Sequence, residues 1–298
     1  MVVAIVVTYH PERILADQLE RLEVQVARVL VVDNGSPCER LRFLNASERH
    51  RPMELIALGK NFGVGAAHNV GIDRARALGA THVLLMDQDS LPQPDMVARL
   101  LAAEQALVAC GEKVGAVGPV YHDPRLSKSW PFFRMSRFGV CGHDCAGSGV
   151  VPCDFLITSG TMTRMTVLNE VGPMNAGYFL EHVDTEWSLR ARHKGYGLYG
   201  VCDARMDHHL GDDIVGVPLS GRQVQLYRPY RHYYLFRNSL LLCREEHARL
   251  PWMLNEARRL LLRLIFFPLF VAPRWERLRY ILLGLWHGLL GRTGGLKA

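Results

Sequence analysis

The chain has 298 residues, carries 35 Lys and Arg against 29 Asp and Glu for a formal net charge of +6, and is 49% apolar. That length suits one large α/β domain or two small ones, and the composition excludes a disordered or collagen-like chain. The charge is unevenly distributed, because residues 222–298 hold 14 basic and 4 acidic residues while residues 1–221 hold 21 and 25.

The first residues contain neither a basic segment nor a small-residue cleavage site, so we expect no signal peptide. The seven cysteines are odd in number and irregularly spaced, which argues against a disulfide framework. The sequence therefore predicts a cytoplasmic protein whose cysteines stay reduced.

Short β-branched runs alternate with helical stretches in the first third of the chain, which is the pattern of βαβ units on a parallel sheet. We expect buried strands at residues 4–8, 29–32 and 82–86. Each is followed by polar residues: Tyr9-His10-Pro11, Asp33-Asn34-Gly35-Ser36 and Asp87-Gln88-Asp89-Ser90. Ligands of open α/β sheets bind at the carboxyl ends of strands, so three segments point at one crevice. The second cluster is equally well explained as a turn, because Asn-Gly readily adopts positive φ.

Residues 61–71 are rich in small side chains and lead into a helix, where backbone N–H groups can approach a phosphate. This is not a dinucleotide-binding fingerprint, because His68 stands in the place of the third glycine, and it lacks the Gly-Lys-Ser/Thr ending of a P-loop. The pattern gives no role to His68.

Two carboxylates, Asp87 and Asp89, flank Gln88 where the third predicted strand ends. Side chains two positions apart in an extended segment point to the same side, so both can reach one cation. Mg²⁺ and Mn²⁺ prefer oxygen ligands and bridge them to phosphates. We therefore predict a site for one of these ions, the alternative being an ordinary acidic surface turn.

Residues 121–153 are rich in Gly, aromatic residues and Cys and show no clear period, so we expect a loop or insertion over the site. Cys141, His143, Cys145 and Cys153 lie close in sequence but lack the paired spacing of a zinc site, which makes zinc the weaker interpretation. Downstream we expect a strand at residues 155–158, a helix near 164–171, and a helix from about 182 to 194 ended by Gly195.

Asp184 and Glu186 lie on the last of these helices, where positions two apart are separated by about 200°. They cannot face one acceptor, so one is a candidate general base and the other is structural. We interpret Glu186 as the structural one, paired with Arg190 four positions on. The adjacent His208 and His209 are either a loop feature or the source of one metal ligand.

The basic C-terminal region, residues 222–298, interleaves arginines with Leu, Ile, Phe and Trp and predicts amphipathic helices. Its uncharged run at residues 264–273 is too short for the ~20 residues that a membrane-spanning helix needs. An interfacial region on an anionic leaflet fits better, with Trp252, Trp275 and Trp286 as anchors. The alternatives are packing on the rest of the chain or a homodimer interface; nucleic-acid binding fits least well.

Six segments occur in an order that is more specific than any one of them: Thr8-Tyr9-His10, Val32-Asp33-Asn34-Gly35-Ser36, Asn61 to Gly71, Asp87-Gln88-Asp89, Ser159-Gly160, and Val183-Asp184-Thr185-Glu186-Trp187-Ser188-Leu189-Arg190. Over roughly residues 1–215 the chain resembles the family 2 glycosyltransferases. The likeness implies an α/β fold of GT-A type, with a Rossmann-like, mostly parallel sheet flanked by helices.

Within that family the chain looks most like bacterial rhamnosyltransferases. This likeness lies in Met86-Asp87-Gln88-Asp89-Ser90, His182-Val183-Asp184-Thr185-Glu186-Trp187, and Arg231-His232-Tyr233-Tyr234-Leu235-Phe236-Arg237-Asn238. Members of that subgroup use dTDP-L-rhamnose as donor. Their acceptors are lipopolysaccharide core, O-antigen intermediates or glycolipids of the rhamnolipid type.

The resemblance implies a role for each matching residue. Asp33 would accept the N3–H of thymine, since an ionised carboxylate only accepts hydrogen bonds. Asp87 and Asp89 would hold the ribose and diphosphate, with Asp89 the direct ligand of Mg²⁺ or Mn²⁺ and His208 completing the metal site. Asp184 would deprotonate the acceptor hydroxyl, although Val183 replaces the acid that precedes the base in many relatives. Further nucleotide-sugar contacts fall on Thr8, Tyr9, Asn69 and Gln88, and acceptor contacts on Ser159, Gly160, Glu186 and Trp187.

We therefore expect a catalytic domain over residues 1–221, with a nucleotide-sugar half at about 1–120 and an acceptor half at about 150–215, followed by the helical region 222–298. The expected activity is inverting, metal-dependent transfer of L-rhamnose to a lipopolysaccharide core or O-antigen saccharide at the inner face of the cytoplasmic membrane. Alternatives are transfer to a glycolipid, or a non-catalytic nucleotide-sugar-binding protein at the membrane, which the three aspartates disfavour. A nucleotidyltransferase would need a Gly-rich basic loop after the first strand, which Tyr9-His10-Pro11 does not supply.

Overall fold

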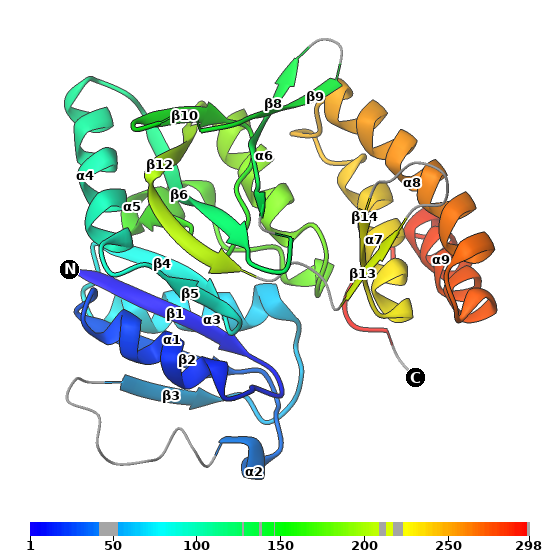
Figure 1. Ribbon diagram of the computed structural model, residues 1–298, viewed down its shortest axis with the longest axis horizontal. Helices are drawn as coiled ribbons and strands as arrows, with labels where there is room; N and C mark the ends of the chain where they lie inside the picture. Colours follow the sequence, from blue (N-terminus) through cyan, green and yellow to red (C-terminus); the bar gives the residue numbers. More distant parts are fainter. Residues whose placement is uncertain are drawn as a thin grey trace.

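The computed structural model describes residues 1–41, 53–126, 128–136, 139–145, 147–208, 213–216 and 223–296. Its main sheet has the strand order β10-β12-β6-β11-β4-β1-β2-β3 (Figure 1). Parallel strands β1 (Val2–Thr8), β2 (Arg28–Asp33), β3 (Met53–Ala57) and β4 (His82–Asp87) form one half. This mostly parallel half confirms the predicted α/β class, and three of its strands are those expected from sequence.

The other half of the sheet is built around two long parallel strands, β6 (Val114–Asp123) and β12 (Gly197–His208). The short strand β11 (Met162–Arg164) runs antiparallel between β4 and β6 and joins the two halves. β10 (Val150–Cys153) and β5 (Ser90–Pro92) pair antiparallel with β12, and β7 (Lys128–Ser129) with β6. Two hairpins lie outside the sheet: β8 (Phe132–Ser136) with β9 (Gly139–His143), and β13 (Asp213–Gly216) with β14 (Gln223–Leu226).

Helices cover both faces of the sheet because successive buried residues of a strand point to opposite sides. Val3, Ile5 and Val7 of β1 join a core with α3 (Val64–Ala77), α5 (Met165–Val171) and α6 (Val183–His193). Ala4 and Val6 join a second core with α1 (Ile14–Glu23) and α4 (Met96–Ala109). The remaining short helices are α2 (Cys38–Leu41) and the 3₁₀ helix η2 (Ala176–Tyr178).

Two expectations for the middle of the chain need correction. Residues 121–153 are not a plain loop, since β6 continues to Asp123 and the segment then forms β7 to β10, but the β8–β9 hairpin lies outside the main sheet and lines a cavity, as an insertion over the site would. Residues 155–158 are not a strand, because only Phe155 pairs, in an isolated bridge to Phe133, before the chain turns. The helix expected from about residue 182 is confirmed as α6, and Gly195 follows it with a φ of 82°.

The C-terminal region folds into three helices, α7 (Pro229–Leu242), α8 (Leu250–Phe270) and α9 (Arg274–Leu289), which lie beside the sheet (Figure 1). A glycine lets α9 approach α7 closely, because a Cβ on Gly284 would lie 2.5 Å from the carbonyl oxygen of Tyr233. The fully buried Arg237 of α7 donates to the carbonyl of Tyr178 at 2.8 Å. The expected helical region is therefore packed against the η2 segment.

The expectation that all seven cysteines stay reduced is wrong for one pair, since Cys145 and Cys202 form a disulfide. The segment after β9 returns beside β12 and brings two residues 57 positions apart to a Cα–Cα distance of 5.4 Å. Spacing along the chain carries no sign of that approach. The other five cysteines are free, and Cys141 and Cys153 are among them.

His68, which had no role in the sequence, is fully buried on α3, and neither ring nitrogen bonds to any residue that the structure describes. Burial lowers its pKa from 6.5 to about 4. As the pH falls below 6.5, His68 becomes protonated in the unfolded chain, whereas in the native state it stays neutral until about pH 4. The free energy of unfolding therefore decreases as the pH falls from 6.5 to about 4.

We expect His68→Leu to remove this loss. Urea unfolding at pH 7 and pH 5 should show the variant gaining about 2 kcal/mol relative to the parent at the lower pH. Equal pH dependence of the two proteins would contradict a buried neutral imidazole.

Candidate active site

The carboxyl ends of β1, β2 and β4 lie side by side, because Thr8 is in register with Asp33 and Val7 with Asp87. The three polar clusters that follow these strands therefore meet at one edge of the sheet. This is the edge of the sheet at which the sequence predicted a crevice.

Asp33 is buried, with 1% of its surface exposed, and both carboxylate oxygens accept hydrogen bonds. Oδ1 accepts from the hydroxyls of Thr8 (3.0 Å) and Ser36, and Oδ2 accepts from the backbone N–H of Gly35 (3.1 Å) and Ser36 (2.8 Å). Gly35 has a φ of 95°, and a Cβ there would lie 2.4 Å from Lys60. Asp33 thus shapes the turn after β2, as the turn interpretation predicted, and lies at the edge of the sheet where the three polar clusters meet.

Tyr9 and Gln88 bind each other through a reciprocal pair of hydrogen bonds. The Tyr9 N–H donates to Gln88 Oε1 at 2.8 Å, and Gln88 Nε2 donates to the Tyr9 carbonyl at 3.1 Å. Asn69 lies elsewhere, since its amide bonds both backbone groups of Met174, at 2.8 and 2.9 Å. Of the four additional residues predicted to contact the nucleotide, Thr8, Tyr9 and Gln88 gather at the crevice, whereas Asn69 ties α3 to the segment before η2.

Asp87, Asp89 and His208 each offer a ligand atom, and these atoms lie within 4.8 Å of one another. Antiparallel pairing of β12 with β5 places His208 opposite Ser90, across 118 residues of sequence. His208 Nδ1 lies 2.7 Å from Ser90 Oγ and 3.4 Å from Asp89 Oδ1. The structure therefore brings the three predicted metal ligands together, while His209 lies outside the described residues.

The charges of this cluster fit a divalent cation. Burial and the nearby Asp89 carboxylate raise the pKa of Asp87 to about 6. Burial opposes protonation of His208, but its hydrogen bond to Asp89 and the two carboxylate charges raise its pKa above the usual value. Two crowded carboxylates and an imidazole nitrogen form a donor set suited to Mg²⁺ or Mn²⁺, and a bound cation would relieve the repulsion between the two acids.

Ser159 connects the metal-ligand cluster to the adjoining cavity. Its hydroxyl lies 2.6 Å from Ser90 Oγ and accepts from the N–H of Asp87 at 3.1 Å. The next residue, Gly160, has a φ of 81°, and a Cβ there would lie 2.5 Å from Pro119. This tight turn holds Ser159 where it contacts Asp87 and Ser90 and also lines the cavity.

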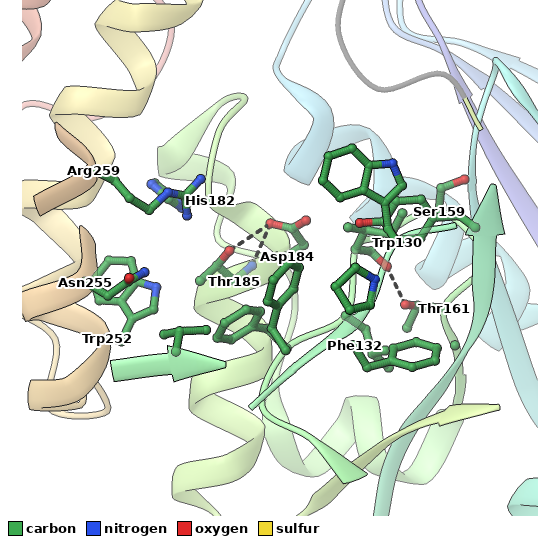
Figure 2. Close-up of a pocket in the computed structure, with 18 of the residues that line it drawn as sticks. Trp130, Phe132, Ser159, Thr161, His182, Asp184, Thr185, Trp252, Asn255 and Arg259 are labelled. Atoms are coloured by element: carbon green, nitrogen blue, oxygen red, sulfur yellow. Dashed lines mark hydrogen bonds between the residues drawn. The ribbon is translucent and has the colours of Figure 1, made fainter. Parts of the chain in front are cut away.

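The cavity has a volume of about 470 Å³ and lies between β6, the β8–β9 hairpin, the start of α6 and α8. Asp184 lies in its middle, between Ser159 and Trp130 on one side and His182 and Arg259 on the other (Figure 2). Burial raises the pKa of Asp184, and hydrogen bonds to Oδ1 from the N–H (2.7 Å) and hydroxyl (3.3 Å) of Thr185 oppose this. The candidate base therefore lines a cavity that Ser159 connects to the metal-ligand cluster.

The far wall of the cavity comes from α8, which the sequence did not assign to the site. Trp252, Asn255 and Arg259 recur at helical spacing on one face of α8, together with Arg258. The expectation that Trp252 anchors the chain in a membrane is wrong, because it is 3% exposed and its ring meets that of His182 edge-on at 5.7 Å. The helical spacing of Trp252, Asn255 and Arg259 was the one feature of the sequence that could have indicated this wall.

Glu186 and Trp187, expected to contact the acceptor, point away from the cavity. Glu186 is 2% exposed and pairs with Arg190 at 2.8 Å and His247 at 3.1 Å, which confirms its predicted structural pair. Trp187 is also buried and donates its indole N–H to the Gly172 carbonyl at 3.0 Å. Of the four expected acceptor contacts, Ser159 lines the cavity and Gly160 lies beside it.

Comparisons with known proteins agree with this geometry. Residues 3–169 match the model of the family described as glycosyl transferase family 2. The chain is 31% identical, over 98% of its length and 96% of the relative's, to the dTDP-rhamnosyl transferase RfbF of Shigella flexneri.

Solved structures with the same fold include S. aureus TarS 1–349, at a TM-score of 0.51 and 17% identity, covering 95% of this chain and 80% of that one. GalNAc-T7 with UDP, GalNAc and Mn²⁺ matches at a TM-score of 0.55 and 10% identity, covering 84% of this chain. The match spans about half of that enzyme, 52% of its chain. At these identities the likeness shows the fold alone, and it confirms the expected GT-A architecture.

Proposed function

The chain belongs to glycosyl transferase family 2 and is a glycosyltransferase, and we propose that it moves L-rhamnose from dTDP-L-rhamnose to a hydroxyl of a lipopolysaccharide core or O-antigen saccharide. The observation that carries this proposal is the 31% sequence identity to a dTDP-rhamnosyl transferase, which extends over nearly the full length of both chains. The grouping of Asp87, Asp89 and His208 beside a cavity that contains Asp184 supports it.

On the donor side, we assign the crevice at the ends of β1, β2 and β4 to the nucleotide. Asp33 accepts the thymine N3–H by exchanging one of its bonds to the turn, and Thr8, Tyr9 and Gln88 line the same edge. Asp87, Asp89 and His208 would hold Mg²⁺ or Mn²⁺. When bound, the ion supplies positive charge that stabilises the departing dTDP.

On the acceptor side, the cavity receives the saccharide, and Asp184 takes the proton of the attacking hydroxyl. Attack from the face opposite the departing dTDP inverts the anomeric carbon. Because α8 forms one wall, we propose that residues 222–298 complete the acceptor site of the catalytic domain formed by residues 1–221.

Release of dTDP from dTDP-L-rhamnose by the purified protein tests the donor assignment. The reaction is followed with Mg²⁺, with Mn²⁺ and with EDTA, and UDP- and GDP-sugars are compared at equal concentration. We expect slow, metal-dependent hydrolysis confined to the rhamnose donor, and faster release with a suitable saccharide. Binding of dTDP is measured in the same samples, and failure to bind any nucleotide would overturn the proposal.

We also propose that α8 and α9 lie on the anionic inner leaflet of the cytoplasmic membrane. Among the described residues, no helix combines the length and apolar character needed to cross a bilayer. The two helices nevertheless expose large apolar side chains: Leu254, Leu261, Leu262, Ile265, Leu269 and Phe270 on α8, and Trp275, Leu282, Trp286 and Leu289 on α9. Exposed Arg258, Arg274 and Arg279 accompany them, which matches an interfacial surface on anionic lipid.

We expect the protein to sediment with vesicles containing anionic phosphatidylglycerol, less at high salt, and weakly with phosphatidylcholine alone. Replacing both exposed tryptophans, Trp275→Ser and Trp286→Ser, should weaken partitioning about tenfold or more. Unchanged partitioning of the variant would contradict this surface. Self-association that disappears in the same variant would instead assign the surface to a homodimer.

A further inference from the structure

The segment that leads into the candidate base has an unusual backbone. Phe179 and His182 both have positive φ, 68° and 65°, although neither is glycine. His182 is in the left-handed helical region and immediately precedes α6, whose second residue is Asp184. Such conformations cost about 1–3 kcal/mol each and persist only where surrounding contacts hold them.

The contacts that hold this segment come from the C-terminal helices. Asn238 of α7 donates to the carbonyls of Tyr178 (2.9 Å) and Glu181 (2.6 Å). Arg231 of α7 pairs with the Glu181 carboxylate at 2.6 Å. The backbone on the N-terminal side of Asp184 is therefore fixed to α7.

The His182 side chain contacts both α7 and α8. Its Nε2 lies 2.9 Å from Ser239 Oγ of α7 and 3.4 Å from Glu256 Oε1 of α8, and the ring packs edge-on against Trp252 of α8. Glu256 is 1% exposed, and its other oxygen is 3.3 Å from Arg259. Burial alone would raise the pKa of Glu256, but His182 and the charges of Arg259 and Arg263 lower it to about 2, so the carboxylate is ionised.

We propose that His182 and Glu256 are positioning residues for Asp184. Glu256 holds the imidazole of His182, the imidazole holds the left-handed backbone at residue 182, and that backbone sets where the carboxylate of Asp184 enters the cavity. This proposal rests on the base role of Asp184 given above. It makes the seating of α8 part of the catalytic geometry.

The network also acts on the charge of Asp184. Four titratable groups act electrostatically on this carboxylate, His182 and Glu181 from its own segment and Asp87 and Tyr121 from the sheet. Arg258 and Arg259 of α8 and Tyr227 before α7 line the same cavity. Of the four, His182 lowers the pKa of Asp184 while Glu181 raises it. Removing the His182 side chain removes an interaction that lowers this pKa, so the pKa of Asp184 rises in His182→Asn.

Glu256→Gln and His182→Asn test the proposal in the full chain. Asparagine tolerates the left-handed backbone conformation, so His182→Asn removes the imidazole and leaves that conformation accessible. We expect each variant to lower kcat for saccharide transfer about tenfold or more, with the donor KM within about twofold of the parent. The acidic limb of the kcat–pH profile should move to higher pH in His182→Asn, because the side chain that lowers the pKa of Asp184 is lost; a purely structural role would not cause this shift.

The matched control is Glu246→Gln, which removes one exposed carboxylate from the same helical region. Thermal unfolding and dTDP binding establish that each variant is folded. Wild-type kcat and pH profile in folded His182→Asn and Glu256→Gln would overturn the positioning role. That result, obtained while Asp184→Asn is inactive, leaves the proposed function intact, whereas a fully active Asp184→Asn removes the base assignment itself.

Discussion

We expect Asp184→Asn to lower kcat for transfer by about 10²–10⁴-fold, the usual contribution of a positioned general base. Asparagine has nearly the same shape and retains a carbonyl oxygen that can accept from the N–H of Thr185, as Oδ1 does at 2.7 Å. The cavity should therefore keep its form while losing the group that takes the proton. Steady-state kinetics with saturating donor and acceptor would measure the loss.

Donor binding distinguishes this result from a general disruption of the protein. Asp184 lines the cavity and is not among the residues assigned to the nucleotide. The Kd for dTDP should therefore stay within about twofold of the parent value. Asp73→Asn, which changes a carboxylate exposed by 72% on α3, serves as the control. An almost fully active Asp184→Asn would contradict the assignment. Glu186 would not be its replacement, because it is buried in its pair with Arg190.

Local sequence patterns predicted the elements and contacts that depend only on residues close together in the chain. Within the strands expected at residues 4–8 and 82–86, residues 4–7 and 83–86 are continuous apolar runs, because helices cover both faces of their sheet. Such runs can be recognised in the sequence without knowing which strand pairs with them. The pair of Glu186 with Arg190 was predictable for the same reason, since four positions on a helix bring side chains together. The strand at residues 155–158 was a false prediction, because an apolar run does not show whether a pairing strand lies beside it.

Contacts between distant segments were not predictable in this way. His208 reaches Asp89 only because β12 pairs with β5, and Glu256 reaches His182 only because α8 packs beside the start of α6. Neither contact leaves a period in the sequence, and His208 was selected through family resemblance. The aromatic and basic wall of α8 was missed because residues of these types also suit a membrane surface, and only the burial of Trp252 against His182 separates the two interpretations.

The two parts of the proposed site differ in how far they depend on local patterns and on contacts between distant segments. The proposed donor side lies at the carboxyl ends of the parallel strands β1, β2 and β4, so chain order and polar clusters indicate it. The proposed acceptor side joins β6, α6 and α8, which are far apart in sequence. We infer that the donor side follows from the shared fold, and that the acceptor side depends on packing particular to the C-terminal helices.

The second large effect is expected at the metal-ligand cluster. Asp87, Asp89 and His208 lie within 4.8 Å of one another, and the proximity of the two carboxylates helps to raise the pKa of Asp87 to about 6. A divalent cation offsets that repulsion, so EDTA should abolish turnover and Mg²⁺ or Mn²⁺ should restore it. Asp89→Asn removes one anionic ligand, and we expect kcat to fall by at least about 10²-fold and metal affinity to fall in parallel.

Titration with Mn²⁺, followed by its paramagnetic resonance signal, separates loss of the ion from loss of the fold. The Asp89→Asn protein should bind Mn²⁺ far more weakly, whereas Asp95→Asn, at a carboxylate exposed by 52% beside Arg99, should bind it normally. Because the ion supplies charge to the departing dTDP, the defect should appear in acceptor-independent hydrolysis as well as in transfer. In Asp184→Asn, Mn²⁺ binding should be unchanged, since that carboxylate lies outside the cluster. Turnover that persists in EDTA would show that these carboxylates serve the nucleotide without a metal.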